Sequence, residues 1–384
     1  MISFWEKHSL LQYDCIVIGN GMTGLSVAAS IKEKYPNSKV LILEKGLLPT
    51  GASTKNAGFA CFGSPTEILA DIQHMGEQSA LQLIEKRKKG LERLKMRLGE
   101  KKINARYHGG FELLNKEKQL NKDQIDYLNE LLMPVFKDRV FRQYDHLIRE
   151  FGFNQDYIQQ LIYNPFEYQI DTGKMVKSLM EYVQMKKVKI ITGAEVKHWE
   201  EDDSGAFKVH VEGGIHEKLV FQTEKIALCT NAFSRHFFPE WDINPGRGHV
   251  LVTAPIPALK FKGAFHFDEG FYYFRNYKKR IIFGGGRNLD FATENTTSFD
   301  KNPQIVKDLK HKLQHIILNN KITPVVEDIW TGIMAFGSYD KNPIVKEIGR
   351  NTVAGVRLNG MGVAISSVLG DEIAALLYNT KSPS

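Results

Sequence analysis

The stretch "DCIVIGNGMTGLSVAASIKEKYPNSKVLILEKG", residues 14–46, constrains the fold more than any other part of the chain. An apolar run leads into a glycine triplet, a helical segment follows, and a second apolar run ends at an acidic residue. Such glycines allow a tight turn, a close approach of backbone amides to a pyrophosphate, and close packing of helix on strand. The pattern therefore predicts a dinucleotide site formed by Gly19, Gly21, Gly24 and Glu44.

Glu44 narrows the choice of dinucleotide. A carboxylate at the end of the second strand accepts hydrogen bonds from the ribose hydroxyls and repels a 2′-phosphate, so NADP is disfavoured. The spacing does not distinguish FAD from NAD.

The rest of the chain predicts a second, interleaved domain. A length of 384 residues is too great for one simple core. From residue 246 onward alternating β segments such as "GFYYFRNYKKRIIFGGG" dominate, and the end returns to an apolar strand, a glycine turn and a helix. A nucleotide fold that opens and closes the chain implies that the other domain is inserted in the middle.

The charge of the chain is concentrated in one helix. The net charge is +7, and "EKRKKGLERLKMRLGEKK", residues 85–102, holds nine basic against three acidic residues. Leu91, Leu94 and Leu98 fall at helical spacing, which indicates an amphipathic helix with a solvated basic face. The alternative is a surface that meets RNA, lipid or an acidic partner.

Cysteines and apolar runs point to a cytoplasmic protein. Cys15, Cys61 and Cys229 lie far apart, which indicates buried thiols rather than a disulfide frame. No Cys-x-x-Cys spacing is present, and we expect no metal site. We find no run long enough for a transmembrane helix and no signal peptide, so we expect no membrane span.

The segments that follow the glycines resemble a known family. "GASTKNAGF" resembles the Gly-Ala-Ser-x-x-Asn-x-Gly segment of the FAD-dependent D-amino-acid oxidase superfamily, which holds glycine oxidase, sarcosine oxidase and gamma-glutamylputrescine oxidase. The residues of this segment are most similar to those of the gamma-glutamylputrescine oxidase branch. Further similar segments follow in that family's order: "GAEVKHW", "LCTNAFS", "PGRGHVLVT", "FYYFRNYKKRIIFGGG", "IWTGIMAFGSYDKNPIVKEI" and "LNGMGVAISSVLGDEIA".

The resemblance implies the fold class and a domain division. We expect an α/β protein with a Rossmann-like FAD-binding domain and an interleaved α+β substrate domain on a mostly antiparallel sheet. The FAD-binding domain would take residues 1–105, 167–237 and 327–384, and the substrate domain residues 106–166 and 238–326.

The resemblance also implies the FAD contacts. Lys45 would lie beside the ribose, and backbone amides from the helix that starts near Gly362 would meet the pyrimidine edge, where reduced flavin carries negative charge. No cysteine lies in "DIWTGIMAF", where some members attach flavin, so we expect non-covalent FAD. The expected contacts are Gly19, Gly21, Met22, Thr23, Gly24, Glu44, Lys45, Ser53, Thr54, Asn56, Ala57, Val196, Thr230, Asn231, Gly360, Met361, Gly362 and Val363.

In this family hydride passes from the amine-bearing carbon to flavin N5, and water hydrolyses the imine. Because no side-chain nucleophile is needed, the residues to find are orienting groups. The resemblance places Arg275 on the substrate carboxylate with Tyr273 capping the pocket, the alternative being a solvated strand arginine.

Further substrate candidates come from strand positions. Arg247 and His249 alternate on one strand and so face the same side, where His249 either tunes amine protonation or is structural. Phe62 and Arg357 are weaker pocket candidates.

The expected substrate is a small amine or amino acid, with oxygen or another molecule as electron acceptor. Two rivals stay open: an FAD oxidase that modifies wobble uridine in tRNA, and a membrane-associated amino-acid dehydrogenase that passes electrons to quinone. A flavin-binding protein without catalysis is a third. Nucleic acid is disfavoured, since phosphate contacts need basic residues near the pocket rather than in one helix. The sequence leaves oligomeric state open.

Overall fold

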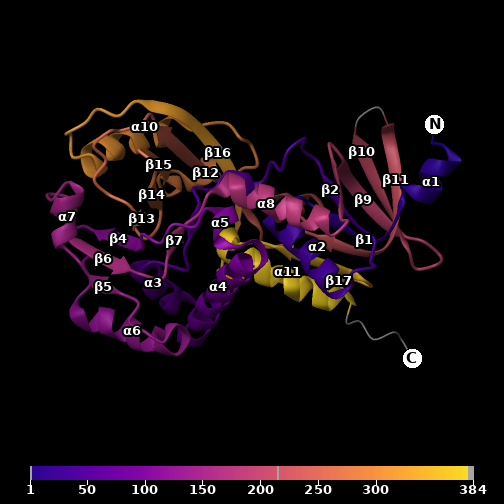
Figure 1. Ribbon diagram of the computed structural model, residues 1–384, viewed down its shortest axis with the longest axis horizontal. Coiled ribbons are helices and arrows are strands. Elements are labelled where there is room, and N and C mark those ends of the chain that lie inside the picture. The colour runs from indigo at the N-terminus through magenta and orange to yellow at the C-terminus, as the bar shows by residue number, and fades with distance from the viewer. Residues whose placement is uncertain (1, 214–215, 379–384) are drawn as a thin grey trace.

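Two large β-sheets lie toward opposite ends of the long axis in the computed structural model, which describes residues 2–213 and 216–378 (Figure 1). The first and last helices, α1 (Phe4–Ser9) and α11 (Gly362–Tyr378), lie in the half of the molecule that holds the first sheet, and the second sheet is formed by internal segments (Figure 1). Within the described residues, no helix has both the length and the apolar character needed to span a membrane.

The first sheet is built around the opening strand. β1 (Gln12–Ile18) pairs in parallel with β2 (Val40–Glu44) on one side and with β11 (His216–Leu228) on the other. β11 pairs in parallel with β18 (Thr352–Val356), so the last strand completes a sheet that the first strand begins. The remaining strands are β8 (Lys189–Thr192), β9 (Glu195–Glu201), β10 (Phe207–Gly213) and β17 (Ile344–Gly349).

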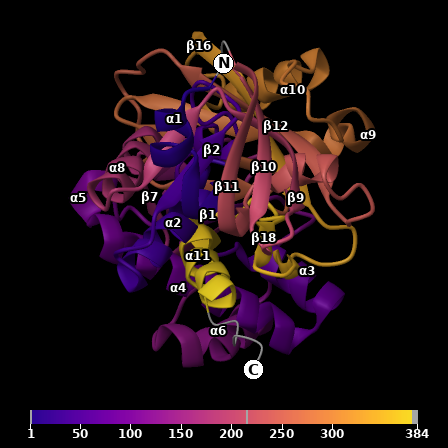
Figure 2. The ribbon, with the colours of Figure 1, turned by 90° about the vertical axis from the view of Figure 1, so that its right-hand side faces the viewer.

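Helices from both ends of the chain pack together beside this sheet. α2 (Met22–Lys34) contacts α11 (Gly362–Tyr378), and α4 (Glu77–Leu98) lies along α11 (Figure 2). Small side chains make the contact close, because Ala28 and Ala29 of α2 are fully buried. The neighbouring helices are α1 (Phe4–Ser9), α3 (Pro65–Met75), α5 (Glu100–Ile103) and α8 (Thr172–Met185).

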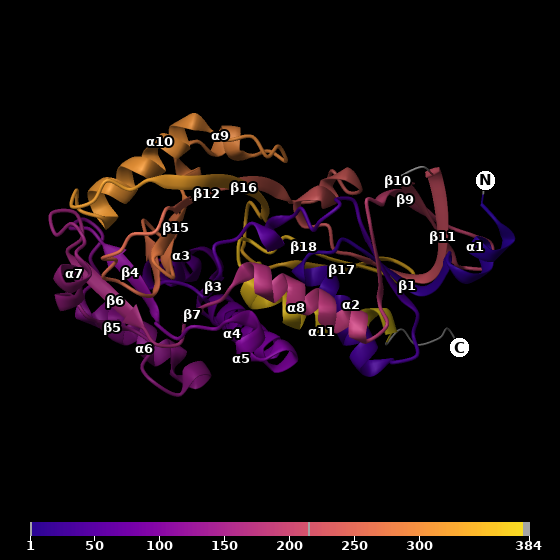
Figure 3. The same ribbon diagram turned by 45° about the horizontal axis from the view of Figure 1, so that its top comes forward.

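The second sheet is antiparallel except where β13 (Ala264–Phe267) meets β4 (Gly110–Leu114) in parallel. α9 (Phe291–Glu294) and α10 (Pro303–Lys312) lie over β12 (Asn244–Thr253) and β16 (Val326–Phe336) (Figure 3). The π-helical turn Leu313–Ile317 continues α10. The remaining strands are β5 (Arg142–Gln143), β6 (Gln160–Asn164), β14 (Tyr272–Tyr277) and β15 (Arg280–Gly285).

The segment that follows β4 mixes helices with short strands. β5 lies between α6 (Lys122–Phe136) and α7 (His146–Phe151), and β6 follows α7 and pairs with β4. β16 pairs with β12 along nearly its whole length, so the strand assigned to the FAD-binding domain from residue 327 belongs to the second sheet. The division into two domains stays a prediction.

The basic helix α4 does not present a merely solvated face. Arg97 is buried and pairs with Glu33 of α2 at 3.0 Å and with Asp371 of α11 at 2.8 Å. Arg93 also binds Asp371, at 2.9 Å. Part of the charge that suggested a nucleic-acid or membrane surface therefore fastens α4 to its neighbouring helices.

Candidate functional site

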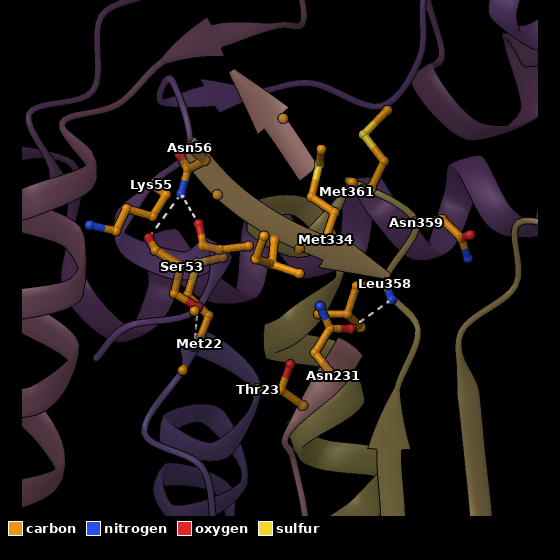
Figure 4. Close-up of a pocket in the computed structure, with 18 of the residues that line it drawn as sticks. Met22, Thr23, Ser53, Lys55, Asn56, Asn231, Met334, Leu358, Asn359 and Met361 are labelled. Carbon is orange, nitrogen blue, oxygen red and sulfur yellow. Dashed lines mark hydrogen bonds between the residues drawn. The ribbon is translucent and has the colours of Figure 1, made fainter. Parts of the chain in front are cut away.

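A cavity of about 610 Å³ lies between the two sheets. At one end its walls are the β1–α2 turn, residues 50–57 and the start of α11, and at the other the inner face of the second sheet. Figure 4 shows its middle, where Met22, Ser53, Asn231 and Met361 approach one another from four separate parts of the chain.

The nucleotide end is formed by the N-terminus of α2. Gly21 is the N-cap and offers no side chain to the first-turn amides. Ser53 Oγ accepts a hydrogen bond of 2.9 Å from the Met22 amide, which fastens the short helix Ala52–Thr54 to α2 (Figure 4). Gly19 has φ of 108°, and a Cβ there would lie 2.7 Å from the Cys229 carbonyl oxygen. This cradle of backbone amides fits a pyrophosphate.

Glu44 lines the cavity directly after β2. Its Oε2 accepts a hydrogen bond of 3.0 Å from the Asn20 amide, and its Oε1 accepts one of 3.0 Å from the Gly46 amide. The Thr50 hydroxyl donates to the same Oε1 at 3.3 Å. A carboxylate can accept further bonds, so this group both shapes the turns and can receive ribose hydroxyls.

The middle of the cavity brings a second helix N-terminus to the site. Asn231 Oδ1 accepts hydrogen bonds from the Arg357 amide at 3.1 Å and the Leu358 amide at 3.3 Å, which positions the turn that precedes α11 (Figure 4). On the opposite wall Asn56 Nδ2 donates to the Ser53 carbonyl at 2.9 Å. The partial positive charge of α11 therefore faces the cavity where the flavin's pyrimidine edge is expected.

The expected cofactor residues gather on this cavity with two exceptions. Thr54 does not line it, because its hydroxyl donates to the Pro49 carbonyl at 2.8 Å. Gly24 packs under the turn instead, where a Cβ would lie 2.0 Å from the Gly19 carbonyl oxygen. Lining residues that the sequence analysis missed include Thr50, Lys55, Ala194, Phe233 and Leu358, all within three residues of an expected one.

Tyr273 lies at the other end of the cavity. Its ring meets that of Phe59 edge-on, with centroids 5.7 Å apart. Burial raises the pKa of Tyr273 to about 12, so the phenol is neutral at physiological pH.

Arg275 is not a substrate ligand in this geometry, which corrects the expectation. Its buried Nη1 donates to the carbonyl oxygens of Gly58 at 2.5 Å, Ile170 at 2.6 Å and Ala57 at 3.3 Å. The guanidinium does not line the cavity, because it is hydrogen-bonded to the backbone of segments that cross the sheet. Arg275 therefore joins the second sheet to the segment after the expected flavin contacts.

Arg247 and His249 share one face of β12, but it is the face away from the cavity. Arg247 binds Glu294 of α9 through two hydrogen bonds of 2.8 Å. His249 is fully buried, and its Nε2 accepts a 2.8 Å hydrogen bond from the Asn302 amide. Gly248, between them, lines the cavity, so His249 cannot reach a substrate there.

The two weaker candidates also lie outside the cavity lining. Arg357 has φ of 61°, and its guanidinium binds Asp242 at 2.8 Å and Asp340 at 3.0 Å. Phe62 is buried against the ring of Phe136, with centroids 4.5 Å apart. Both residues support the walls rather than form them.

Arg287 is the cation that the sequence analysis missed. It follows the glycines that end β15, and its guanidinium lies 3.8 Å from the ring centroid of Phe336. Among the described residues no carboxylate pairs with it. Burial lowers its pKa to about 10, with Glu294 opposing the shift, so it stays charged at neutral pH. Its position directly after "FGGG" was the available signal.

Acidic groups border the same end. Glu67 lines the cavity and pairs with Lys341 at 3.1 Å and with Arg87 at 3.9 Å. Burial raises the pKa of Glu67, but Lys341 and Arg87 outweigh it and hold the value at about 2. His266 lines the same wall. The described residues contain no group of His, Cys, Asp and Glu placed to hold a metal ion.

The fold and this cavity define a class: a sheet with a parallel centre joined to a second, mostly antiparallel sheet, with two helix N-termini facing the cavity between them. A model of the family described as "FAD dependent oxidoreductase" matches residues 14–376. The chain belongs to this family of FAD-dependent oxidoreductases. The cradle at α2, the carboxylate of Glu44 and the amides of α11 fit the phosphates, ribose and flavin edge of FAD.

Solved structures share the fold at low sequence identity. An L-proline dehydrogenase from P. horikoshii is 15% identical with a TM-score of 0.75, over 97% of this chain and 95% of that one. Glycine oxidase from Geobacillus kaustophilus is 18% identical, TM-score 0.72, over 97% and 96%. L-amino acid deaminase from Proteus vulgaris is 19% identical, TM-score 0.70, over 96% and 91%. A search of curated proteins found no match.

Proposed function

We propose that the protein oxidises a small amino acid whose carboxylate binds Arg287. The observation that carries this proposal is the half-buried guanidinium of Arg287, which lines the far end of the FAD cavity without a carboxylate partner among the described residues. A planar guanidinium binds a carboxylate through two parallel hydrogen bonds. When bound, FAD accepts a hydride from the carbon that bears the amine.

The aromatic residues of this end orient the substrate and keep water out. Phe59, Phe271, Tyr273 and Phe336 line the cavity around Arg287 and His266. Their rings leave little room for solvent beside the reacting carbon, and the phenol of Tyr273 supplies a neutral hydrogen-bonding group. With the carboxylate held by Arg287, the amine is directed back toward the flavin end.

The N-terminus of α11 supports the electron transfer. α11 runs for 17 residues from Gly362, and its first-turn amides line the cavity. Amides and helix dipole at this point stabilise negative charge on the reduced cofactor. Because no cysteine lies in the β16 segment, we propose that FAD is bound non-covalently.

Anaerobic reduction of the bound flavin tests this function. Purified holoenzyme is mixed without oxygen with a panel of amino acids and of amines that lack a carboxylate, and the yellow absorbance is followed. We expect at least one amino acid to bleach the flavin faster than its decarboxylated counterpart. Admission of air then separates an oxidase, whose colour returns quickly, from a dehydrogenase. Failure of the whole panel would refute the proposal.

A further inference from the structure

Three polar side chains stand in a row on the cavity face of the second sheet. His266 of β13 lies directly opposite Glu112 of β4 on one side and Tyr273 of β14 on the other. Residues opposite each other in paired strands point to the same face. Tyr273 and His266 line the cavity, whereas Glu112 lies deeper, where it accepts hydrogen bonds from the Ser64 hydroxyl at 2.9 Å and the Thr66 amide at 3.0 Å.

His266 has a ring nitrogen that is buried without a hydrogen-bond partner among the described residues. This nitrogen, Nε2, lies 3.9 Å from Oε2 of Glu167, and the two side chains are 12% and 3% exposed. A buried polar atom without a partner is costly, so its retention next to a carboxyl group calls for a functional reason.

Glu167 is fixed so that only one of its oxygens faces His266. Oε1 accepts hydrogen bonds from the Phe62 amide at 3.1 Å and the Gly63 amide at 3.4 Å. The carboxyl group lies over Gly110, where a Cβ would be only 2.1 Å from Oε2. The site therefore leaves room for this acid and directs its free oxygen at the histidine.

Glu167 and Glu112 differ from Glu67 in their lack of cations. Within the described residues neither has a lysine or arginine partner, whereas Glu67 has Lys341 and Arg87. Burial raises the pKa of Glu167 to about 8, helped by the charges of Glu67 and Glu112. Burial lowers the pKa of His266 to about 4, with Glu67 opposing. Near neutral pH the imidazole is therefore uncharged, and the ionised form of Glu167 that can accept a proton grows as pH rises toward 8.

We propose that His266 accepts the proton that the substrate ammonium must lose before oxidation, and that Glu167 takes up the proton from the histidine's Nε2. An N–H bond of the ammonium breaks and one forms on the ring nitrogen that does not face Glu167. The Nε2–H bond breaks and an O–H bond forms on Oε2, so no electrons leave either residue. His266 is then a catalytic residue, and Glu167, which acts through it, is a positioning residue.

The proposal rests on the proposed amine oxidation and explains how the amine becomes neutral. Ionised Glu167 makes the adjacent ring more basic, since a negative charge favours the imidazolium form. Among the described groups around the ring, Glu112 also titrates near this range, because burial raises its pKa to about 7, and a Glu112→Gln variant therefore serves as the control. The other groups keep their charge states. Glu67 stays ionised beside Lys341 and Arg87, Tyr273 stays neutral, and the buried thiol of Cys61 stays protonated because burial raises its pKa.

The pH dependence of anaerobic flavin reduction at saturating substrate tests this pairing. We expect the wild-type rate to rise about tenfold per pH unit and to level off near pH 8, the pKa of Glu167. Glu167→Gln keeps an oxygen for the Phe62 and Gly63 amides but cannot carry the proton. This variant should remove the rising limb of the pH profile and lower the plateau rate of flavin reduction about 10- to 100-fold. The dissociation constant for the substrate should change little.

Two further variants separate chemistry from structure. His266→Asn should slow reduction at least about 100-fold at pH 8.5. Glu112→Gln removes another buried carboxyl group from the same wall and should keep the limb. Flavin content and melting temperature verify that each variant is folded. A limb that persists in Glu167→Gln overturns this proposal alone, whereas no bleaching of the wild type by any amine overturns the proposed function as well.

Discussion

The nucleotide end of the cavity and the proposed substrate end present different chemical groups to the site. At the nucleotide end, backbone amides of α2 and α11 face the site, and side chains such as Ser53 and Asn231 mainly hold turns in place. At the substrate end, side chains of Arg287, His266 and Tyr273 face the site directly. In the proposed function the first end binds phosphate and flavin groups that do not vary, whereas the second would change its specificity by single substitutions.

A substitution at the nucleotide end should have the largest effect. Gly19→Val places a side chain at φ of 108° and against the Cys229 carbonyl, so we expect purified protein without bound FAD. Gly349→Ala on β17 is the matched control, because a Cβ there meets nothing within 4 Å. The ratio of flavin to protein absorbance measures the effect. Full flavin content in the valine variant would show that the turn is not the cradle.

Arg275 tests whether the two ends are mechanically joined. Arg275→Leu removes the buried donor from the carbonyls of Ala57 and Ile170 and leaves the Gly58 carbonyl with the Ile170 amide alone, so we expect a loss of about 3 kcal/mol in the free energy of unfolding. The partly exposed Arg280 pairs with Glu327, and Arg280→Leu should cost less than about 1 kcal/mol. Urea unfolding measures both, and equal losses would contradict the joining role.

Glu167 should make the free energy of unfolding depend on pH. Its folded-state pKa of about 8 lies above the unfolded value. At pH values between these two pKa values the folded state binds the proton and the unfolded state does not, so the stability of the wild type falls as pH rises. Glu167→Gln lacks this loss, so we expect it to gain about 2 kcal/mol over wild type at pH 9 relative to pH 5. Thermal unfolding at the two pH values measures the difference. A pH-independent difference would place the acid in its ionised form throughout.

Glu44 should give the smallest effect. Glu44→Gln keeps an oxygen for one of the amides that Glu44 binds but weakens the bonds to the ribose hydroxyls. The dissociation constant for FAD should rise about tenfold, or about 1.4 kcal/mol. Fluorescence titration of the deflavinated protein measures this, and an unchanged constant would assign Glu44 to the turn alone.

The difference between the ends also decides what could be predicted from the sequence. Most residues predicted for the nucleotide end line the cavity, because they belong to short contiguous segments whose turns demand particular residues, as at Gly19 and Asn56. Alternation on β12 correctly placed Arg247 and His249 on one face but could not say which face the cavity takes. α9 and α10 cover that face, and only the structure shows this.

Arg275 shows a second limit. It lies on the same face as Tyr273, two residues further along β14, but there the backbone of Gly58 and Ile170 covers the sheet. The alternation of side chains along one strand shows which face each side chain occupies, but not where another segment covers that face. The position of His266 opposite Tyr273 could have been predicted from the hairpin whose turn follows Phe267. Its approach to Glu167 could not, because that residue comes from a loop distant in sequence.

The measurement that most directly tests the central claim compares Arg287→Leu with wild type in anaerobic flavin reduction. The substrates are the amino acid that reduces the wild type best and the amine obtained from it by removal of the carboxylate, with Arg280→Leu as control. We predict that Arg287→Leu raises the dissociation constant for the amino acid about 100-fold, or about 2.7 kcal/mol, and leaves the amine unaffected. An unchanged constant for the amino acid, or an equal loss with both substrates, would contradict the account.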